Sequence, residues 1–225
     1  MNPFQMRGEW SPLIATVYNA VIAPALRELY EEHIERFLAD ERVSAGTSLL
    51  DVGCGMGHAL GIVARRNPQL LLTGVDLSQK MVQRARREHR GVANLLFQQG
   101  DAMALPFEPE TFDLVMSTAS IKHWPDPIRG LSQMYRVLKP AGRILVMEAD
   151  SNCSRAAADN FVRRWRWINR LTLPVVTEYF IRFVARQGTS DGELESMLLS
   201  AGFEQVTLER ITDLPAVVGR GVKTG

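Results

Sequence analysis

The chain has 225 residues, the length of one large α/β domain, which is enough to bury a sizeable core. Apolar residues make up 46% of it and charged residues 23%, a composition that excludes disordered, collagen-like and coiled-coil proteins. The formal net charge is only +1, so the composition provides no long-range field that would favour a nucleic-acid backbone or an anionic membrane.

Cysteine and hydropathy patterns predict a cytoplasmic protein. Cys54 and Cys153 are too few and too far apart for a disulfide framework, and no cysteine or histidine spacing indicates a metal site. Residues 13–26 are rich in apolar residues, but Tyr18 and Asn19 interrupt them, so we interpret this segment as a core-packing helix rather than a signal peptide. Since no run of about 18 apolar residues occurs, we expect no membrane span.

The first 150 residues alternate between strand and helix patterns. Residues 11–39 carry apolar positions at helical spacing, with Pro24 dividing them, which predicts one or two leading helices. From Ser48 onward, short apolar runs alternate with amphipathic stretches, a pattern typical of a parallel sheet with helices on its faces. The predicted strands are Leu49–Val52, Leu70–Val75, Leu95–Gln98, Phe112–Met116 and Arg143–Glu148, and the predicted helices are Ala59–Arg66, Lys80–Glu88 and Pro127–Leu138, with a turn at residues 139–142 before the last strand.

The last third of the chain begins with helices. Residues 151–187 show helical periodicity and no strand signal. Asp191–Ala201 is predicted as a capped helix that stops at Gly202, and Phe203–Ile211 and Ala216–Val222 are predicted as two further strands. We expect a single domain over residues 1–225, made of a helical cap (1–45), a ligand-binding core (46–150), a helical insertion (151–188) and a C-terminal helix with strands (189–225).

A glycine-rich turn follows the first predicted strand. The strand runs directly into Asp51-Val-Gly-Cys-Gly-Met-Gly57, and a helix pattern starts at once. Glycine lets the backbone turn tightly and approach a ligand, and the new helix presents unpaired N–H groups to an anionic group. The turn alone is a weak signal, because tight strand-to-helix turns need glycine whether or not they bind anything.

Acidic residues at the ends of successive strands strengthen this signal. Asp51, Asp76 and Asp101 recur at intervals of 25 residues, which places them near the carboxyl edge of one sheet, where open α/β proteins bind ligands. Each acid alone has a structural explanation, as a turn former, a residue near a helix start or a loop acid. Together they favour ligand binding, with Asp76 placed to accept hydrogen bonds from a ribose diol.

The glycine spacing separates two nucleotide-binding classes. The NAD fingerprint Gly-x-Gly-x-x-Gly would start at Gly53 and Gly55 and need a third glycine where the chain has His58. The glycines fall instead at 53, 55 and 57. An oxidoreductase function is therefore disfavoured.

Four motifs resemble those of class I S-adenosylmethionine-dependent methyltransferases. Asp51-Val-Gly-Cys-Gly-Met-Gly57 is similar to the first motif, and Gly74-Val-Asp-Leu-Ser78 with Met81 is similar to the second. Gly100-Asp-Ala102, followed by Phe112-Asp-Leu-Val115, is similar to the third, and Arg136-Val-Leu-Lys-Pro-Ala-Gly-Arg-Ile-Leu145 to the turn before the fifth strand. The resemblance implies a Rossmann-like, seven-stranded, mostly parallel sheet with helices on both faces, N-terminal helices and a helical insertion before the sixth strand.

The resemblance implies S-adenosyl-L-methionine as cofactor and S-adenosyl-L-homocysteine as product. Asp76 would hold the ribose hydroxyls, and Asp101 would accept a hydrogen bond from the adenine amino group. Leu77 and Met81 would pack on the adenine, although core packing explains them equally well. The implied cofactor-binding residues are Tyr18, Asp51, Gly53, Cys54, Gly55, Asp76, Leu77, Met81, Gly100, Asp101, Ala102 and Ser117.

The segment after the fourth predicted strand contains the catalytic candidate. Relatives resembling the ubiquinone-biosynthesis type often carry His-His-x-x-Asp here, and in this chain Lys122 takes the first position while His123 and Asp126 remain. A histidine near the transferred methyl group could remove a proton from the acceptor. A structural role for His123 beside Trp124 is an equally good explanation, and the base assignment stays open.

The insertion offers candidate acceptor contacts. Its aromatic residues could line an apolar pocket, although core packing is the more frequent use of such residues, and its arginines could attract an acidic acceptor, although a solvated helix face is the simpler explanation. These residues are Phe161, Trp165, Trp167, Tyr179, Phe180 and Phe183, and Arg163, Arg164, Arg166 and Arg170.

The sequence as a whole favours a methyltransferase that acts on O, N, S or C of a small molecule. A nucleic-acid methyltransferase is less favoured, because Ser117-Thr-Ala-Ser120 replaces the Asn-Pro-Pro-Tyr type of motif. A cofactor-binding scaffold without turnover, and decarboxylation or cyclisation on the same fold, stay as alternatives. We expect no metal, and the sequence leaves the acceptor and the oligomeric state open.

Overall fold

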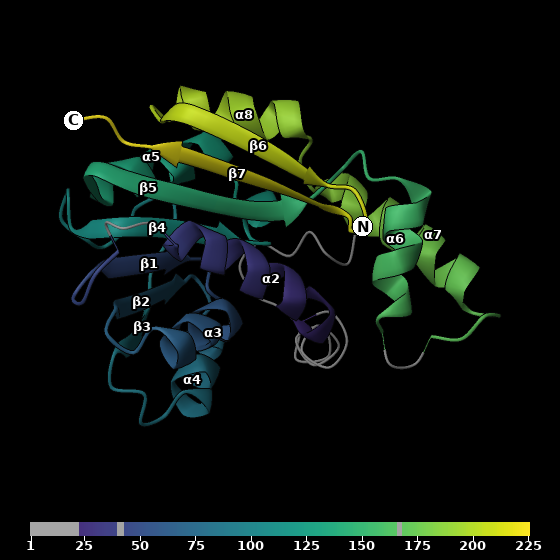
Figure 1. Cartoon of the computed structure of the whole chain (residues 1–225), viewed down its shortest axis with the longest axis horizontal. Coiled ribbons are helices and arrows are strands. Elements are labelled where there is room, and N and C mark those ends of the chain that lie inside the picture. The colour runs from purple at the N-terminus through teal and green to yellow at the C-terminus, as the bar shows by residue number, and fades with distance from the viewer. Residues whose placement is uncertain (1–22, 40–42, 166–167) are drawn as a thin grey trace.

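A seven-stranded sheet forms the centre of the computed structural model, which describes residues 23–39, 43–165 and 168–225 (Figure 1). The strand order is β3-β2-β1-β4-β5-β7-β6, and β7 is antiparallel to both of its neighbours while the other pairs are parallel. This order confirms the predicted α/β fold class. The strands are β1 (Ser48–Val52), β2 (Leu71–Asp76), β3 (Leu95–Gln99), β4 (Phe112–Thr118), β5 (Leu138–Ala149), β6 (Glu204–Ile211) and β7 (Ala216–Val222).

Helices cover both faces of the sheet because successive strand residues point to opposite sides. In β1, Leu49 packs with helices α2, α3 and α4, whereas Leu50 packs with α5 and α8 on the other face. Both leucines are completely buried, as expected for a parallel strand that is covered on two sides. These helices are α2 (Ala23–Leu38), α3 (His58–Arg66), α4 (Gln79–Glu88), α5 (Pro127–Val137) and α8 (Asp191–Ser200).

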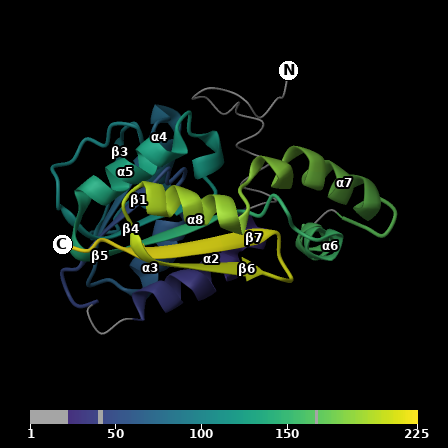
Figure 2. The same cartoon turned by 90° about the horizontal axis from the view of Figure 1, so that it is seen from above.

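A third group of helices follows β5 and precedes α8 along the chain. It consists of α6 (Arg155–Arg163), α7 (Leu173–Phe183) and the short helix η3 (Ala185–Gln187), which confirms the predicted helical segment over its described residues. Phe161 and Phe180 belong to a small core of their own, separate from the two cores beside the sheet. Figures 1 and 2 show α6 and α7 beyond the carboxyl end of β5, at one end of the molecule.

The turn predicted at residues 139–142 is instead part of β5. The strand begins at Leu138, which pairs with Phe112, and pairing shifts register before Arg143 faces Leu114. The residues between them bulge out, and their backbone is satisfied by the C-terminal segment: Ala141 donates to the Lys223 carbonyl at 2.8 Å. Because this partner lies some 80 residues away in the sequence, local patterns did not predict the bulge.

Helix termini follow the sequence signals where the structure describes them. Ser190 and Glu193 form a reciprocal capping box at the start of α8, and Gly202 ends the helix with φ +100°. The leading helical segment is described from Ala23 as α2, and the predicted cofactor residue Tyr18 lies outside the described residues. Within the described ranges, no helix is both long enough and apolar enough to cross a membrane.

Candidate active site

The glycine-rich turn is tied to the neighbouring strand through its backbone. Gly53 and Cys54 both donate to the Val75 carbonyl, at 2.8 and 3.0 Å, so the end of β1 lies against the end of β2. Gly53 has φ +77°, which favours glycine, and a side chain on it would overlap Ser120. Gly55, which the sequence also singled out, has a positive φ of +55° as well.

Asp76 fastens this turn with its carboxylate. One oxygen accepts the Gly55 N–H at 2.9 Å, and the other accepts the Ser78 N–H at 2.8 Å. Burial raises the pKa of Asp76, although these two hydrogen bonds act in the opposite direction. A carboxylate oxygen can accept more than one hydrogen bond. Asp76 therefore keeps acceptor capacity for the ribose diol that the sequence assigned to it.

Asp51 is a buried acid without a partner in the described part of the chain. The side chain is completely buried, and neither carboxyl oxygen has a hydrogen-bond partner among the described residues. Burial raises the pKa of Asp51 to about 8, and the negative charge of Asp76 acts in the same direction. Near it, a side chain added at Gly55 would meet no atom within 4 Å. An uncompensated acid beside an open turn fits a ligand that carries both a cationic amine and a ribose, and S-adenosylmethionine carries both.

Asp51→Asn is expected to flatten the pH dependence of stability. Below pH 4 the carboxyl is protonated in both folded and unfolded chains. Between pH 4 and about 8 it ionises only when unfolded, because its folded pKa is about 8, so the free energy of unfolding falls as the pH rises. Urea unfolding without cofactor at pH 5 and pH 9 measures this effect. From pH 5 to pH 9, the free energy of unfolding of the variant relative to that of the wild type should rise by several kcal/mol, at most about 5 kcal/mol.

Asp113→Asn is the matched control for this measurement. Lys139 and Ser48 hydrogen-bond Asp113 and lower its pKa, so the group is ionised in both states from pH 5 to 9. Its effect on stability should be the same at both pH values. If Asp51→Asn also behaves in this way, Asp51 is ionised in the folded protein and the pKa of about 8 is wrong.

The residues predicted to hold the adenine lie next to Asp76. Gly100 donates its N–H to the Asp76 carbonyl at 3.1 Å, and the Asp101 carboxylate accepts the Met103 N–H at 2.8 Å. Leu77 is half exposed and is not part of the core, whereas Met81 and Ala102 are buried. The structure therefore brings the three acids of the sequence pattern to one edge of the sheet, and it leaves Leu77 free to contact a ligand.

Ser117 and Ser120 have different environments. Ser117 is completely buried, and its hydroxyl donates to the Val52 carbonyl at 2.8 Å, so its side chain joins β4 to β1. A contact from Ser117 to a cofactor would have to come from its backbone. Ser120, which the sequence did not single out, lies against Gly53 and accepts a hydrogen bond from the Trp124 indole at 3.1 Å. Because four small or polar residues follow one another here, sequence spacing did not distinguish the two serines.

His123 ends the short helix η2 (Ile121–His123) on the same loop. Its N–H donates to the Ser120 carbonyl at 2.9 Å, and the residue is exposed at the surface. Desolvation by the neighbouring protein atoms lowers the pKa of His123 to about 4; Lys122 adds to the shift and Glu148 opposes it. The imidazole is therefore neutral at physiological pH and can accept a proton. Asp126 instead caps helix α5, where it accepts the Arg129 N–H at 3.0 Å.

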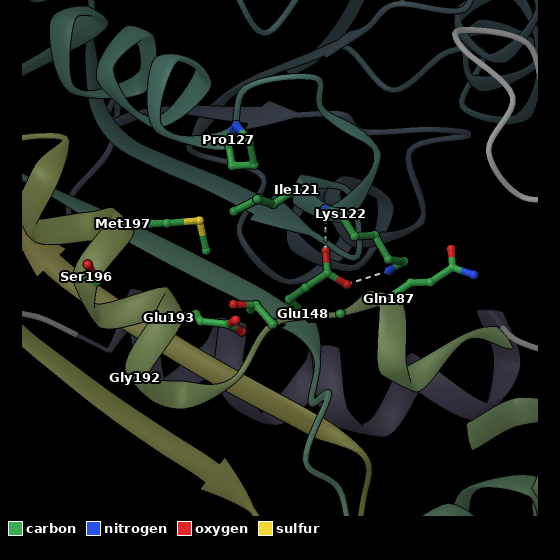
Figure 3. A pocket seen from close by; sticks show the side chains of 11 residues that line it. Ile121, Lys122, Pro127, Glu148, Gln187, Gly192, Glu193, Ser196 and Met197 are labelled. Atoms are coloured by element: carbon green, nitrogen blue, oxygen red, sulfur yellow. Dashed lines mark hydrogen bonds and ion pairs between the residues drawn. The ribbon is translucent and has the colours of Figure 1, made fainter. Parts of the chain in front are cut away.

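A buried ion pair lies at the wall of a cavity beside η2 (Figure 3). The Lys122 ammonium bonds the Glu148 carboxylate and also donates to the Ala119 carbonyl at 3.3 Å. The side chains are 11% and 1% exposed. Glu148 accepts the Ala149 N–H at 2.8 Å as well, so its charge is well compensated. The cavity has a volume of about 570 Å³ and is lined by Ile121, Lys122, Pro127, Glu148, Gln187, Gly188, Thr189, Gly192, Glu193, Ser196 and Met197.

Sequence reasoning missed this pair as a functional element. Its two signals were a lysine where relatives often have histidine and a glutamate near the end of an otherwise apolar strand. The two residues are 26 positions apart in the sequence, which hides their contact. Elsewhere, no three His, Cys, Asp or Glu side chains of the described residues gather closely enough to hold a metal ion.

The insertion aromatics do not line the cavity in the described part of the chain. Phe161, Trp165 and Phe180 contact one another at ring distances of 5.1 to 6.1 Å, which supports the core-packing explanation. Tyr179 and Phe183 are exposed on α7. Trp167 lies outside the described residues.

Comparisons with known proteins agree with this geometry. A family described as a methyltransferase domain matches residues 50–146. The demethylmenaquinone methyltransferase of Staphylococcus aureus (strain JH9) is 28% identical over 207 residues, which cover 86% of this chain and 84% of the relative.

Two solved structures share the fold. A SAM-dependent methyltransferase from Aquifex aeolicus has a TM-score of 0.67 at 16% identity and covers 95% of this chain and 99% of its own. The [4+2]-cyclase SpnF has a TM-score of 0.67 at 22% identity, over 88% of this chain and 81% of its own. At these identities the likeness concerns the fold alone.

Proposed function

Because this chain is a class I S-adenosylmethionine-dependent methyltransferase, we propose that its methyl acceptor is a small molecule bound in the cavity beside η2. The observation that carries this proposal is a shared wall. Ser120 borders Gly53 in the glycine-rich turn, and the next residues, Ile121 and Lys122, line the cavity. A single loop thus separates the cofactor residues from a space large enough for a metabolite. The S. aureus relative, whose name states a small-molecule acceptor, supports the same class.

We assign the cofactor to the carboxyl edge of β1, β2 and β4. Asp76 accepts from the ribose, Gly55 leaves room for the methionine part, and Asp51 compensates its cationic amine, while Gly53 lets the turn pack against Ser120. Asp101, Ala102, Leu77 and Met81 border the adenine. When bound, S-adenosylmethionine supplies an activated methyl group on a sulfonium leaving group.

The chain itself then has two tasks. The first is alignment, since a rigid loop between two binding spaces holds an acceptor in line and excludes water. The second is proton removal where the acceptor atom carries a proton. His123 is neutral above pH 4 and takes this role in our proposal; it follows Lys122 on the shared loop but is not itself one of the residues that line the cavity. Its low pKa makes it a weak base, which suits an acceptor that loses its proton as the methyl bond forms.

Transfer of a tritiated methyl group to a panel of phenols, quinols, amines and thiols tests the function. Calorimetry with S-adenosylmethionine, S-adenosylhomocysteine and NADH accompanies it. We expect micromolar binding of the first two, none of NADH, and turnover on at least one acceptor. With a hydroxyl acceptor, His123→Ala should leave cofactor affinity unchanged and lower turnover about 100-fold. Wild-type turnover assigned to His123 should fall only as the pH drops through about 4, because the base must be neutral.

Two results would contradict these assignments. Full turnover of His123→Ala on an acceptor that must lose a proton would remove the base role and leave the structural one. Methyl transfer that is confined to RNA, with no small acceptor accepted, would remove the small-molecule proposal.

A further inference from the structure

One face of helix α7 exposes a continuous row of large apolar side chains. Leu171, Val175, Tyr179 and Phe183 are 89%, 72%, 45% and 41% exposed, and they recur every fourth residue. This spacing places them on one side of the helix and of the residue stretch that leads into it. The rings of Tyr179 and Phe183 lie 4.9 Å apart, so the row is contiguous at its end. We refer to these four residues as the α7 stripe.

Core packing does not account for the α7 stripe. The opposite side of α7 carries Thr177 and Phe180, which are both buried, and Phe180 packs in one core with residues of α6. The helix is thus apolar on two sides, while a helix that is anchored on one face ordinarily has a polar outer face. Contiguous apolar surface of this kind marks a binding site rather than a stable solvent boundary.

The sequence around the α7 stripe is strongly basic. Residues 155–187 contain seven arginines but only two acids, Asp159 and Glu178, in a protein whose net charge is +1. Glu178 forms ion pairs with Arg155 at 3.0 Å and with Arg182 at 2.6 Å, and Arg155 also lies 3.9 Å from Asp159. Both acids are therefore compensated locally.

Further arginines of this segment remain available for a partner. Arg163, Arg170 and Arg186 are exposed, and none of them forms an ion pair within the described ranges. The segment consequently presents apolar side chains together with uncompensated positive charge. A binding partner that complements this surface has an apolar interior and an anionic boundary.

We propose that α7 docks on the surface of an anionic lipid bilayer, with the α7 stripe among the acyl chains and the arginines at the headgroups. A helix that is apolar on one side and basic at its flanks lies in the membrane interface in this manner. Each basic residue close to an anionic leaflet adds attraction. Both ingredients are present here on the same helix and its flanks.

Two other occupants fit the surface less well. A second copy of this chain would bring one basic segment against another, and the repulsion would oppose the apolar contact. RNA would suit the arginines, but single-stranded nucleic acid stacks on aromatic rings, and the two most exposed members of the stripe are Leu171 and Val175.

The position of α7 is compatible with docking. Figures 1 and 2 show α6 and α7 at one end of the molecule, beyond the carboxyl end of β5, while β3 lies at the far side of the sheet. A flat surface can therefore approach α7 without meeting β3. The proposal concerns where the enzyme works and does not depend on which acceptor it methylates.

Co-sedimentation with vesicles tests the proposal on the full chain. Vesicles of phosphatidylcholine with phosphatidylglycerol should retain the protein, and vesicles of phosphatidylcholine alone should retain much less. Val175→Glu should lower the partition coefficient about tenfold, since a large apolar side chain is replaced by a charge of the wrong sign. Leu96→Glu, at a residue of β3 that is 69% exposed, is the matched control and should bind like the wild type.

The arginines have a test of their own. The double change Arg163→Gln/Arg186→Gln should lower partition about tenfold on phosphatidylglycerol vesicles, and added salt should do the same. Arg87→Gln, an exposed position on α4, should have no effect. Circular dichroism of every variant should match that of the wild type, since all the changed residues are exposed.

Several outcomes would overturn the proposal. They are the absence of partition on phosphatidylglycerol vesicles, an equal loss in Leu96→Glu, a dimer in solution that Val175→Glu dissociates, and an arginine-dependent affinity for RNA without affinity for vesicles. None of these results would bear on methyl transfer, which is measured with soluble acceptors.

Discussion

Replacement of Asp76 by alanine is expected to raise the dissociation constant for S-adenosylhomocysteine about 100-fold, which corresponds to roughly 2.7 kcal/mol. The carboxylate is the only ionised acceptor that we assign to the ribose, and hydrogen bonds to a charged group each contribute about 1.5–3 kcal/mol. Isothermal titration calorimetry measures the change directly. Asp113→Ala, an acid at the opposite end of β4, is the control and should bind like the wild type.

A second ligand separates the ribose contact from the structural role of Asp76. Its carboxylate also holds the Gly55 and Ser78 N–H groups, so the alanine variant loses part of the turn as well as the ribose acceptor. The 2′-deoxy analogue of S-adenosylhomocysteine lacks one of the two ribose donors. The wild type should bind it about tenfold more weakly than S-adenosylhomocysteine, and Asp76→Ala should bind both equally. If the variant still discriminates between the two ligands, the ribose is held elsewhere.

Lys122→Met is expected to lower the free energy of unfolding by about 3–5 kcal/mol. The substitution leaves the Glu148 carboxylate, of which 1% is exposed, without its cation at the cavity wall. Removing one partner of a buried pair costs more than the pair itself contributes, because an uncompensated charge stays in a poorly solvated place. Urea unfolding at pH 7 measures the loss.

Two variants show whether burial causes this loss. Lys139→Met removes the cation of a pair of similar length, Lys139 to Asp113 at 2.8 Å, but both of its side chains are solvated, so we expect a change of about 1 kcal/mol or less. Lys122→Met/Glu148→Gln removes the orphaned charge and should recover most of the stability. Equal losses in Lys122→Met and Lys139→Met, or a double variant as unstable as Lys122→Met, would show that the pair does not behave as a buried one.

The ion pair and the arginines around the α7 stripe both concern charge that the composition does not reveal. The net charge of +1 is a sum in which acids elsewhere in the chain offset the basic segment 155–187. It therefore describes the whole molecule correctly but does not reveal the positive charge of this one segment. The arginines of the insertion were expected on a solvated face, and the described ones are exposed. Only the folded structure reveals the exposed apolar row beside them, because Val175 and Phe180 look alike in a hydropathy pattern although one is exposed and the other buried.

Local patterns in the sequence determined the α/β class, the order of strands and helices, and the candidate cofactor residues. Strand and helix periods differ, and glycines and capping residues mark the ends of elements, so these features are written within a few neighbouring residues. Parallel strands that alternate with helices also bring the ends of successive strands to one edge. For this reason, the spacing of Asp51, Asp76 and Asp101 along the chain was enough to place them together.

Only the tertiary structure decided which side chains meet across long stretches of chain. It buried Asp51 with no partner among the described residues, used the Ser117 hydroxyl inside the sheet, placed Ser120 against Gly53 and paired Lys122 with Glu148. It also turned the predicted turn before the fifth strand into a bulge held by Lys223. These outcomes depend on which residues pack against each face of a helix or strand, and those residues are distant in the sequence.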